Sequence, residues 1–313
     1  MDLFSYVIDF LFEWNLCILM FTFYTLVISV SGLAVHFSKQ IPVPDFFLQA
    51  FKFGKMAHDA RPWKIISMME VPKRWFFHFY ITASVVITMT ALQMWSIYTM
   101  GNPLSHWTSF TLDVLTVQHR KSTVSATDAG VSLLLLMLHI FRRLYENLCV
   151  SVFSSSHMNI LHYLVGHTHY IGAIALMIAE APGFDNDSPD IAITALQAHH
   201  VLGFVLYIIG FTMQHQSLHK LAGLRKNSGE HVKHEHKMPE GGMFEYLSCP
   251  HMFAEVLVYI GILIVLQGHT GWLVVTIWVL SNQIQVALMN HSWYVGTFKD
   301  YPKHRRAIFP FVL

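Results

Sequence analysis

Seven long apolar stretches divide the chain, and they restrict its fold more than any other feature. A helix that crosses a membrane needs about 20 predominantly apolar residues, and most of the stretches reach that length. Only 12% of the residues are charged, and the mean hydropathy is +0.44. The sequence therefore predicts an all-α polytopic membrane protein with about seven transmembrane helices. The predicted spans are residues 16–37, 75–98, 131–153, 160–181, 191–213, 252–267 and 271–290.

The basic residues are distributed unevenly between the two sides that these spans define. Sixteen of the 20 Lys and Arg residues lie in the segments 38–74, 214–250 and 291–313, which share one side if there are seven spans. Loops that carry such an excess of Lys and Arg face the cytosol. We therefore predict a lumenal amino terminus and a cytosolic carboxyl terminus.

Three regions follow from this pattern. Residues 1–74 hold the first span and a basic cytosolic loop, and residues 75–213 hold spans two to five. Residues 214–313 hold a polar cytosolic loop, spans six and seven, and a polar tail. The first 14 residues contain no Lys or Arg, unlike the charged start of a cleaved signal peptide, so we expect the first span to be retained.

Span three carries charges, which are costly in a membrane and therefore indicate a functional site. His139, Arg142, Arg143 and Glu146 are spaced at i, i+3, i+4 and i+7, so on a helix they share one face. The pattern predicts a stripe that faces a cofactor. The alternative is an internal Arg–Glu pair that only holds helices together.

A second polar concentration lies between spans five and six, from His215 to Glu255. The basic run 224–226 can meet phosphates, and Glu245, Tyr246 and Glu255 can fix a ribose, an amide or a proton. The alternative is a solvated loop whose charges only set orientation. The chain has no Gly-rich dinucleotide fingerprint, so a bound nucleotide would not be held by a Rossmann unit.

Other site classes find little support in the sequence. The 21 histidines include one HxxxH pair, His215 and His219, but no HxxHH box of the kind that di-iron membrane enzymes need, so we predict no metal site. The three cysteines form neither a disulfide framework nor a zinc spacing. A net charge of +1 argues against binding to nucleic acid.

The carboxyl-terminal residues NHSWYVGTFKDYPKHRRAIFPFVL resemble the end of the steroid 5α-reductase family. That family ends with His-x-x-Tyr, a DYPK(x)R(K/R)A motif and a hydrophobic-Pro-Phe finish. The matching positions are His291, Tyr294, 300–303, Arg305 and 310–311, together with 224–226, Pro239, Gly241, 244–246, Ser248, Pro250 and Glu255. Within the family, the polyprenol reductase branch fits best, on the segments 71–80, 142–155, 224–227, 244–250 and 301–307.

This resemblance, which covers about residues 60–313, implies a multi-pass enzyme of the endoplasmic reticulum membrane. Such an enzyme uses cytosolic NADPH to saturate the α-isoprene unit of a long-chain polyprenoid on the way to dolichol, the lipid carrier of protein N-glycosylation. It also implies that residues 214–313 form the reductase region with the cofactor loop. The positions that the resemblance assigns to the cofactor are Arg143, Arg225, Glu245, Tyr246, His251, Glu255, His291, Tyr294 and Arg305.

The chain departs from the family pattern at two places. Asn-Tyr usually follows the Ser-x-Pro step, where this chain has His251-Met252, so an imidazole would replace an amide beside the nicotinamide. Steroid-acting members carry a His-Tyr pair in span three, where this chain has His139-Ile140. The missing phenol argues against a 3-oxo steroid substrate. The glutamate that precedes a hydrophobe-Pro step in those members is matched by Glu70.

The chemistry of the reaction narrows the substrate. A hydride attacks an alkene readily only where the developing carbanion is stabilised, which an α,β-unsaturated aldehyde allows and an allylic alcohol does not. We therefore predict a polyprenal as the direct acceptor, with an acid near its carbonyl oxygen. The candidates are Glu70, which stands at a membrane boundary, then His139 and Tyr145. The alternatives are a reductase that acts on 3-oxo steroids, an isoprenylcysteine-type methyltransferase and a non-enzymatic seven-span protein.

Overall fold

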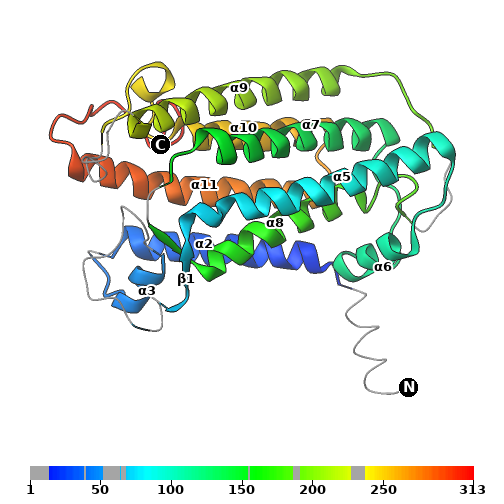
Figure 1. Ribbon diagram of the computed structural model, residues 1–313, viewed down its shortest axis with the longest axis horizontal. Coiled ribbons are helices and arrows are strands. Elements are labelled where there is room, and N and C mark those ends of the chain that lie inside the picture. The colour runs from blue at the N-terminus through cyan, green and yellow to red at the C-terminus, as the bar shows by residue number, and fades with distance from the viewer. Residues whose placement is uncertain are drawn as a thin grey trace.

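The computed structural model describes residues 14–38, 40–51, 64, 68–153, 156–185, 191–226 and 237–313. Seven long helices run side by side along the molecule (Figure 1). They are α2 (Leu16–His36), α5 (Phe76–Met100), α7 (Ala126–Tyr145), α8 (Ile160–Ile178), α9 (Ala198–Lys226), α10 (Pro250–Val265) and α11 (Thr270–Thr297). Each lies at the position of a predicted span. The histidines of the loop 227–236 and much of the basic loop before Glu70 lie outside the described residues.

Shorter elements mark the two ends of the bundle (Figure 1). At the end that we call the tail end, β1 (Glu70–Pro72) pairs antiparallel with β2 (His157–Asn159), close to α3 (Asp45–Phe51). The 3-10 turn η2 (Lys73–Trp75) leads from β1 into α5, and the carboxyl-terminal segment lies at the same end. The helix α6 (His106–Leu115) lies at the opposite end, which we call the α6 end. Consecutive long helices alternate in direction between these ends.

Among the described residues, four helical segments are long and apolar enough to cross a membrane: α2, α9, α11 and the segment Lys73–Met100, which contains α5. The helix α10 is apolar but shorter. Large apolar side chains point outward, such as Phe23 on α2 and Met89 on α5, which are 62% and 66% exposed. Exposed apolar surface of this extent suits a lipid environment. The multi-pass helical class is therefore supported, while the total of seven spans and their orientation stay predictions.

Several helix boundaries differ from the sequence prediction: α9 begins at Ala198 instead of 191, and α11 continues to Thr297 instead of ending at 290, so His291 and Tyr294 lie on a helix and not in the tail. The fifth span was expected to end at residue 213, but α9 continues to Lys226. The extra turns stay helical because their polar side chains find partners inside the bundle: Gln214 contacts Glu255, and His215 contacts Glu146. The third span was expected from 131 to 153. Instead α7 begins at Ala126 and gives way at Tyr145 to the π-helical turn η3 (Glu146–Val150).

The closest helix pair, α9 and α10, packs through glycines. A Cβ atom added to Gly203 would lie 2.5 Å from the carbonyl oxygen of Gly261. One added to Gly210 would lie 2.7 Å from the carbonyl oxygen of Ala254. Small residues let helix backbones approach closely in membranes, where van der Waals packing drives helix association. This contact fixes the position of Glu255, one residue after Ala254, against α9.

We expect Gly210→Ala to destabilise the protein by about 1–3 kcal/mol, because the new methyl group collides with the backbone of α10. Thermal unfolding in detergent measures this effect. Gly223→Ala in the same helix is the matched control, since no atom lies within 4 Å of its added Cβ. Equal unfolding temperatures for the two variants would contradict the close packing.

Candidate active site

The carboxyl-terminal half of α7 carries a buried ion-pair network. Glu146 is fully buried, and its carboxylate lies 2.6 Å from the Nη1 of Arg143 and 3.7 Å from the Nη1 of Arg142. The Nδ1 of His215, on α9, lies 2.8 Å from the same carboxylate. The structure therefore brings the residues of the predicted stripe together and shows the internal Arg–Glu pair that the sequence offered as the alternative. The contact of this stripe with a cofactor stays a prediction.

A second carboxylate, Glu255 on α10, completes the network. The Nε2 of His139 lies 3.2 Å from its Oε1, and the side chain of Gln214 donates to its Oε2. Arg142 donates to the Oε1 of Gln214 and lies 3.3 Å from the Nδ1 of His139. Because a guanidinium only donates, Nδ1 is the acceptor, so His139 keeps its proton on Nε2 and donates it to Glu255.

Two guanidinium groups thus face two carboxylates within one buried cluster, and a neutral His139 lies between them. Arg143 also donates to the hydroxyl of Tyr80 on α5, at 3.3 Å. Buried charges are tolerated when they are paired and hydrogen-bonded. Each arginine here pairs with Glu146, while the Nε of each has no hydrogen-bond partner among the described residues. We call His139, Arg142, Arg143, Glu146, Gln214, His215 and Glu255 the α7 network.

A second polar cluster lies at the tail end. The hydroxyl of Ser248 lies 2.6 Å from the Nδ1 of His291 and 2.5 Å from the hydroxyl of Tyr301, and it donates to the carbonyl oxygen of Arg306. Burial raises the pKa of Tyr301 above its usual range. The ring of Tyr294 stacks on that of Tyr301, with centroids 5.9 Å apart. This cluster ties the final loop to α10 and α11.

Beside this cluster, Gly241 and Gly242 form a turn with positive φ angles of 77° and 60°. A Cβ atom at either glycine would lie 3.0 Å from the Nζ of Lys220. The Oε1 of Glu245 accepts from the backbone nitrogen of Gly241 at 2.5 Å, and Arg305 donates to the carbonyl oxygen of Pro239 at 2.9 Å. This turn leads into the short 3-10 helix η5 (Gly242–Glu245), which precedes α10.

The first turn of α10 joins the two clusters. Ser248 precedes this helix by two residues, and Glu255 lies in its second turn. Gln214 donates to the carbonyl oxygen of His251 at 3.4 Å as well as to Glu255. Most of the predicted cofactor residues therefore fall into an interior group, Arg143 and Glu255, and a tail-end group, with His251 between them. The tail-end group is Glu245, His291, Tyr294 and Arg305.

Four predicted site residues lie apart from these contacts. Glu70 is exposed on β1, opposite Asn159 in the strand pair, and Tyr145 is 53% exposed at the end of α7. Within the described part of the chain, neither side chain makes a hydrogen bond or ion pair with the α7 network. Tyr246 is 51% exposed. Arg225 is exposed and donates to the carbonyl oxygen of Val152 at 2.6 Å.

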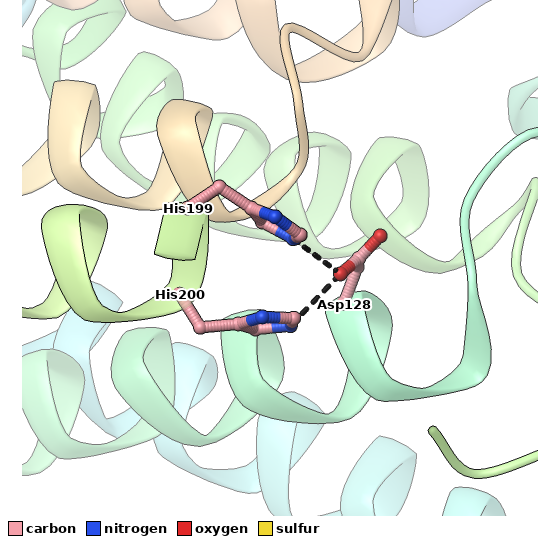
Figure 2. Close-up of side chains that lie close together, drawn as sticks. All are labelled: Asp128, His199 and His200. Carbon is pink, nitrogen blue, oxygen red and sulfur yellow. Dashed lines mark hydrogen bonds and ion pairs between the residues drawn. The ribbon is translucent and has the colours of Figure 1, made fainter. Parts of the chain in front are cut away.

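The α6 end holds three possible metal ligands, Asp128, His199 and His200, whose ligand atoms lie within 4.8 Å of one another (Figure 2). The Nε2 atoms of the histidines lie 3.0 Å and 2.9 Å from the same oxygen of Asp128. However, the Nδ1 of His200 accepts from the backbone nitrogen of Gln197 at 2.9 Å. The neutral ring then carries its proton on Nε2, whereas a metal at Nε2 would need it on Nδ1. The tautomer of His200 therefore argues against a metal centre, and of the two histidines His199 is the one that hydrogen-bonds to Asp128.

Sequence reasoning missed Gln214, Tyr80 and Ser248, which hold the predicted residues in place. Gln214 was missed because the fifth span was ended one residue too early. Its signal is a lone amide in an apolar run, which in a membrane needs a partner. His215 was noted for its spacing to His219, but its partner is Glu146. Tyr80 and Ser248 lie within matched family segments and carry no independent signal.

The sequence of this chain is similar to those of known proteins. Residues 187–313 match the family model described as 3-oxo-5-alpha-steroid 4-dehydrogenase. The polyprenal reductase of Drosophila melanogaster is 33% identical, over 96% of this chain and 94% of that protein. Those of Caenorhabditis elegans and Homo sapiens are 31% and 32% identical, over 92% and 87% of this chain.

The chain is therefore a membrane oxidoreductase of the class that acts on CH–CH groups. It belongs to the steroid 5α-reductase family, in the branch that contains the polyprenal reductases.

Replacing Glu146 tests whether the α7 network stabilises the fold. We expect Glu146→Gln to lower the free energy of unfolding by about 3–5 kcal/mol, because it leaves two buried guanidinium groups facing only one carboxylate. Glu180→Gln is the control, since that side chain is 32% exposed at the α6 end. Chemical unfolding of both variants in detergent measures the difference. A wild-type stability for Glu146→Gln would show that the pairing is dispensable.

Proposed function

We propose that this chain reduces the α-isoprene double bond of polyprenals, giving dolichals, in the synthesis of dolichol for protein N-glycosylation. The single observation that carries the proposal is the identity to polyprenal reductases over nearly the whole chain. The structure supports it with a buried, charge-paired network inside an apolar helix bundle. Such a bundle suits a long lipid substrate, because the reacting end can enter while the tail stays in the bilayer.

We propose NADPH as the reductant, and the tail end carries groups that fit it. Arg305 is 3% exposed, and its Nε has no hydrogen-bond partner among the described residues. Gly241 and Gly242 let the backbone lie close to the ammonium group of Lys220, which a Cβ atom at either position would approach to 3.0 Å. Cationic groups around a glycine turn suit the phosphates of a nucleotide. When bound, NADPH supplies a hydride, and Arg225, Glu245, Tyr246, His291, Tyr294 and Arg305 would hold its polar parts.

The interior residues would orient the reacting centre. Glu255 and His139 face each other where α7 and α10 meet, and Arg143 lies on the same network, so these three would surround the reduced end of the cofactor. His251 would support it from the first turn of α10. Of the three acid candidates, His139 is the one in the network, while Glu70 and Tyr145 lie on the surface. His139, Arg142 and Glu146 of the α7 network are buried, which keeps the reacting end in a largely apolar interior.

We further propose that the protein lies in the endoplasmic reticulum membrane with seven spans, a lumenal amino terminus and a cytosolic carboxyl terminus. The alternating directions of the seven long helices support this arrangement. It would open the tail-end cluster to cytosolic NADPH. It would also place the α6 end, which includes Asp128, on the lumenal side of the membrane.

Reduction of a 3-oxo steroid is the second candidate, because the family model that matches residues 187–313 carries that description. Ile140 argues against it. This residue is fully buried on α7 next to His139 and offers no proton to a ketone.

A product assay on the purified protein in detergent tests the proposal. With NADPH, we expect loss of the α double bond from polyprenal and not from polyprenol, because only the aldehyde stabilises the carbanion. Reduction of the alcohol itself would contradict this chemistry. Turnover of a 3-oxo-Δ4 steroid without turnover of polyprenal would replace the proposed substrate.

Substitutions of two neighbouring arginines, Arg305 and Arg306, test the proposed cofactor site. We expect Arg305→Gln to raise the Kd for NADPH by about tenfold or more, the loss of one hydrogen bond to a charged group. Arg306→Gln should leave it unchanged, because that side chain is exposed. Titration of NADPH fluorescence measures both. A larger effect at Arg306 than at Arg305 would refute the assignment.

A further inference from the structure

A directed chain of hydrogen bonds crosses three helices in the interior. The indole Nε1 of Trp278, on α11, donates to the Nδ1 of His169, on α8, at 3.1 Å. An indole nitrogen can only donate, so Nδ1 carries the lone pair and the proton of the neutral ring lies on Nε2. That Nε2 lies 2.8 Å from the hydroxyl oxygen of Tyr259, on α10. Because His169 is the donor, the oxygen of Tyr259 is the acceptor.

The hydroxyl proton of Tyr259 is therefore left for another acceptor, and no atom of the described residues accepts it. Tyr259 is 1% exposed, and its ring stacks on that of Trp272, with centroids 5.4 Å apart. Leaving a buried donor unsatisfied costs roughly 1–3 kcal/mol, so such groups usually have a partner in the functional state. Tyr259 is held in place, and its hydroxyl proton has no acceptor. This combination indicates that a ligand supplies the acceptor.

The position of Tyr259 indicates which ligand. Tyr259 follows Glu255 by one helical turn on α10, so both side chains lie on the same face. Its ring lies 6.2 Å from that of His139, edge to face. The residue after His139 is Ile140, so α7 offers no phenol at this level. Tyr259 brings one to the same region from α10.

We propose that Tyr259 is a catalytic residue that donates its hydroxyl hydrogen bond to the carbonyl oxygen of the polyprenal, an inference that rests on the proposed function. As the β carbon accepts the hydride, the C=C electron pair moves to the bond between the α carbon and the carbonyl carbon, and the oxygen becomes negative. Tyr259 stabilises that enolate oxygen. The α carbon then takes a proton from solvent, which restores the aldehyde, so one hydride and one proton are added in total.

His169 and Trp278 act as positioning residues in this proposal. If the hydroxyl of Tyr259 did not accept from His169, it could instead donate to the ring of His169. Its proton would then not be available to a substrate. Trp278 prevents this by holding the histidine tautomer. The indole is needed for that purpose, since phenylalanine would fill much of the space without a donor.

The test is Tyr259→Phe, assayed with NADPH and geranial, a short α,β-unsaturated aldehyde. We expect kcat to fall by about 10²-fold or more, the usual effect of removing one donor to a developing oxyanion, with the Kd for NADPH unchanged. Trp278→Phe should lower kcat by a smaller factor. Tyr207→Phe is the matched control and should keep the wild-type kcat, because that buried phenol donates to the carbonyl oxygen of Leu135 on α7.

A second readout needs no turnover. The infrared carbonyl band of geranial bound to the wild-type protein without cofactor should shift to lower frequency, and Tyr259→Phe should abolish the shift. An unshifted band in the wild type would overturn the proposal even if the variant did not fold. An unchanged kcat in a folded Tyr259→Phe would also overturn it, while leaving the proposed function intact. Absence of polyprenal reduction by the wild type would instead overturn the proposed function.

Discussion

The pairing of buried charge between α7 and its neighbours is the constraint on which the rest of the structure depends. Two adjacent arginines on α7 need carboxylates in an apolar interior. Glu146 pairs with both directly, and Glu255 joins them through Gln214 and His139. Glu146 comes from the π turn that ends α7, and Glu255 comes from α10. The close glycine contact between α9 and α10 is what allows Gln214 to reach both Arg142 and Glu255.

From this constraint the layout of the site follows. The network holds the amino-terminal turns of α10 in place, and the loop before α10 carries the glycine turn, Ser248 and the contacts to the final segment. The groups suited to phosphates therefore lie at the tail end, and the groups suited to a reacting carbonyl lie deeper among the helices. A long cofactor can span the two, because α10 connects them directly.

Much of this could be predicted from the sequence. The positions of the seven helices follow from hydropathy, and the stripe on α7 follows from helical spacing. The direct contact of His139 with Glu255 could not be predicted, because 116 residues separate them and no local pattern encodes the pairing. The length of α9 was misjudged because polar residues beyond 213 suggested a loop, whereas tertiary partners keep them helical. The exposed positions of Glu70 and Tyr145 likewise depend on packing that a sequence pattern does not contain.

In the proposed function, the α7 network and the tail-end cluster form one site along α10. A cryo-electron microscopy structure of the protein with NADPH and a saturated prenyl aldehyde tests it most directly. We expect the nicotinamide beside His139 and Glu255, and the phosphates at Gly241, Gly242 and Arg305. Nucleotide density at the α6 end, or phosphates away from the glycine turn with the α7 network unchanged, would contradict it.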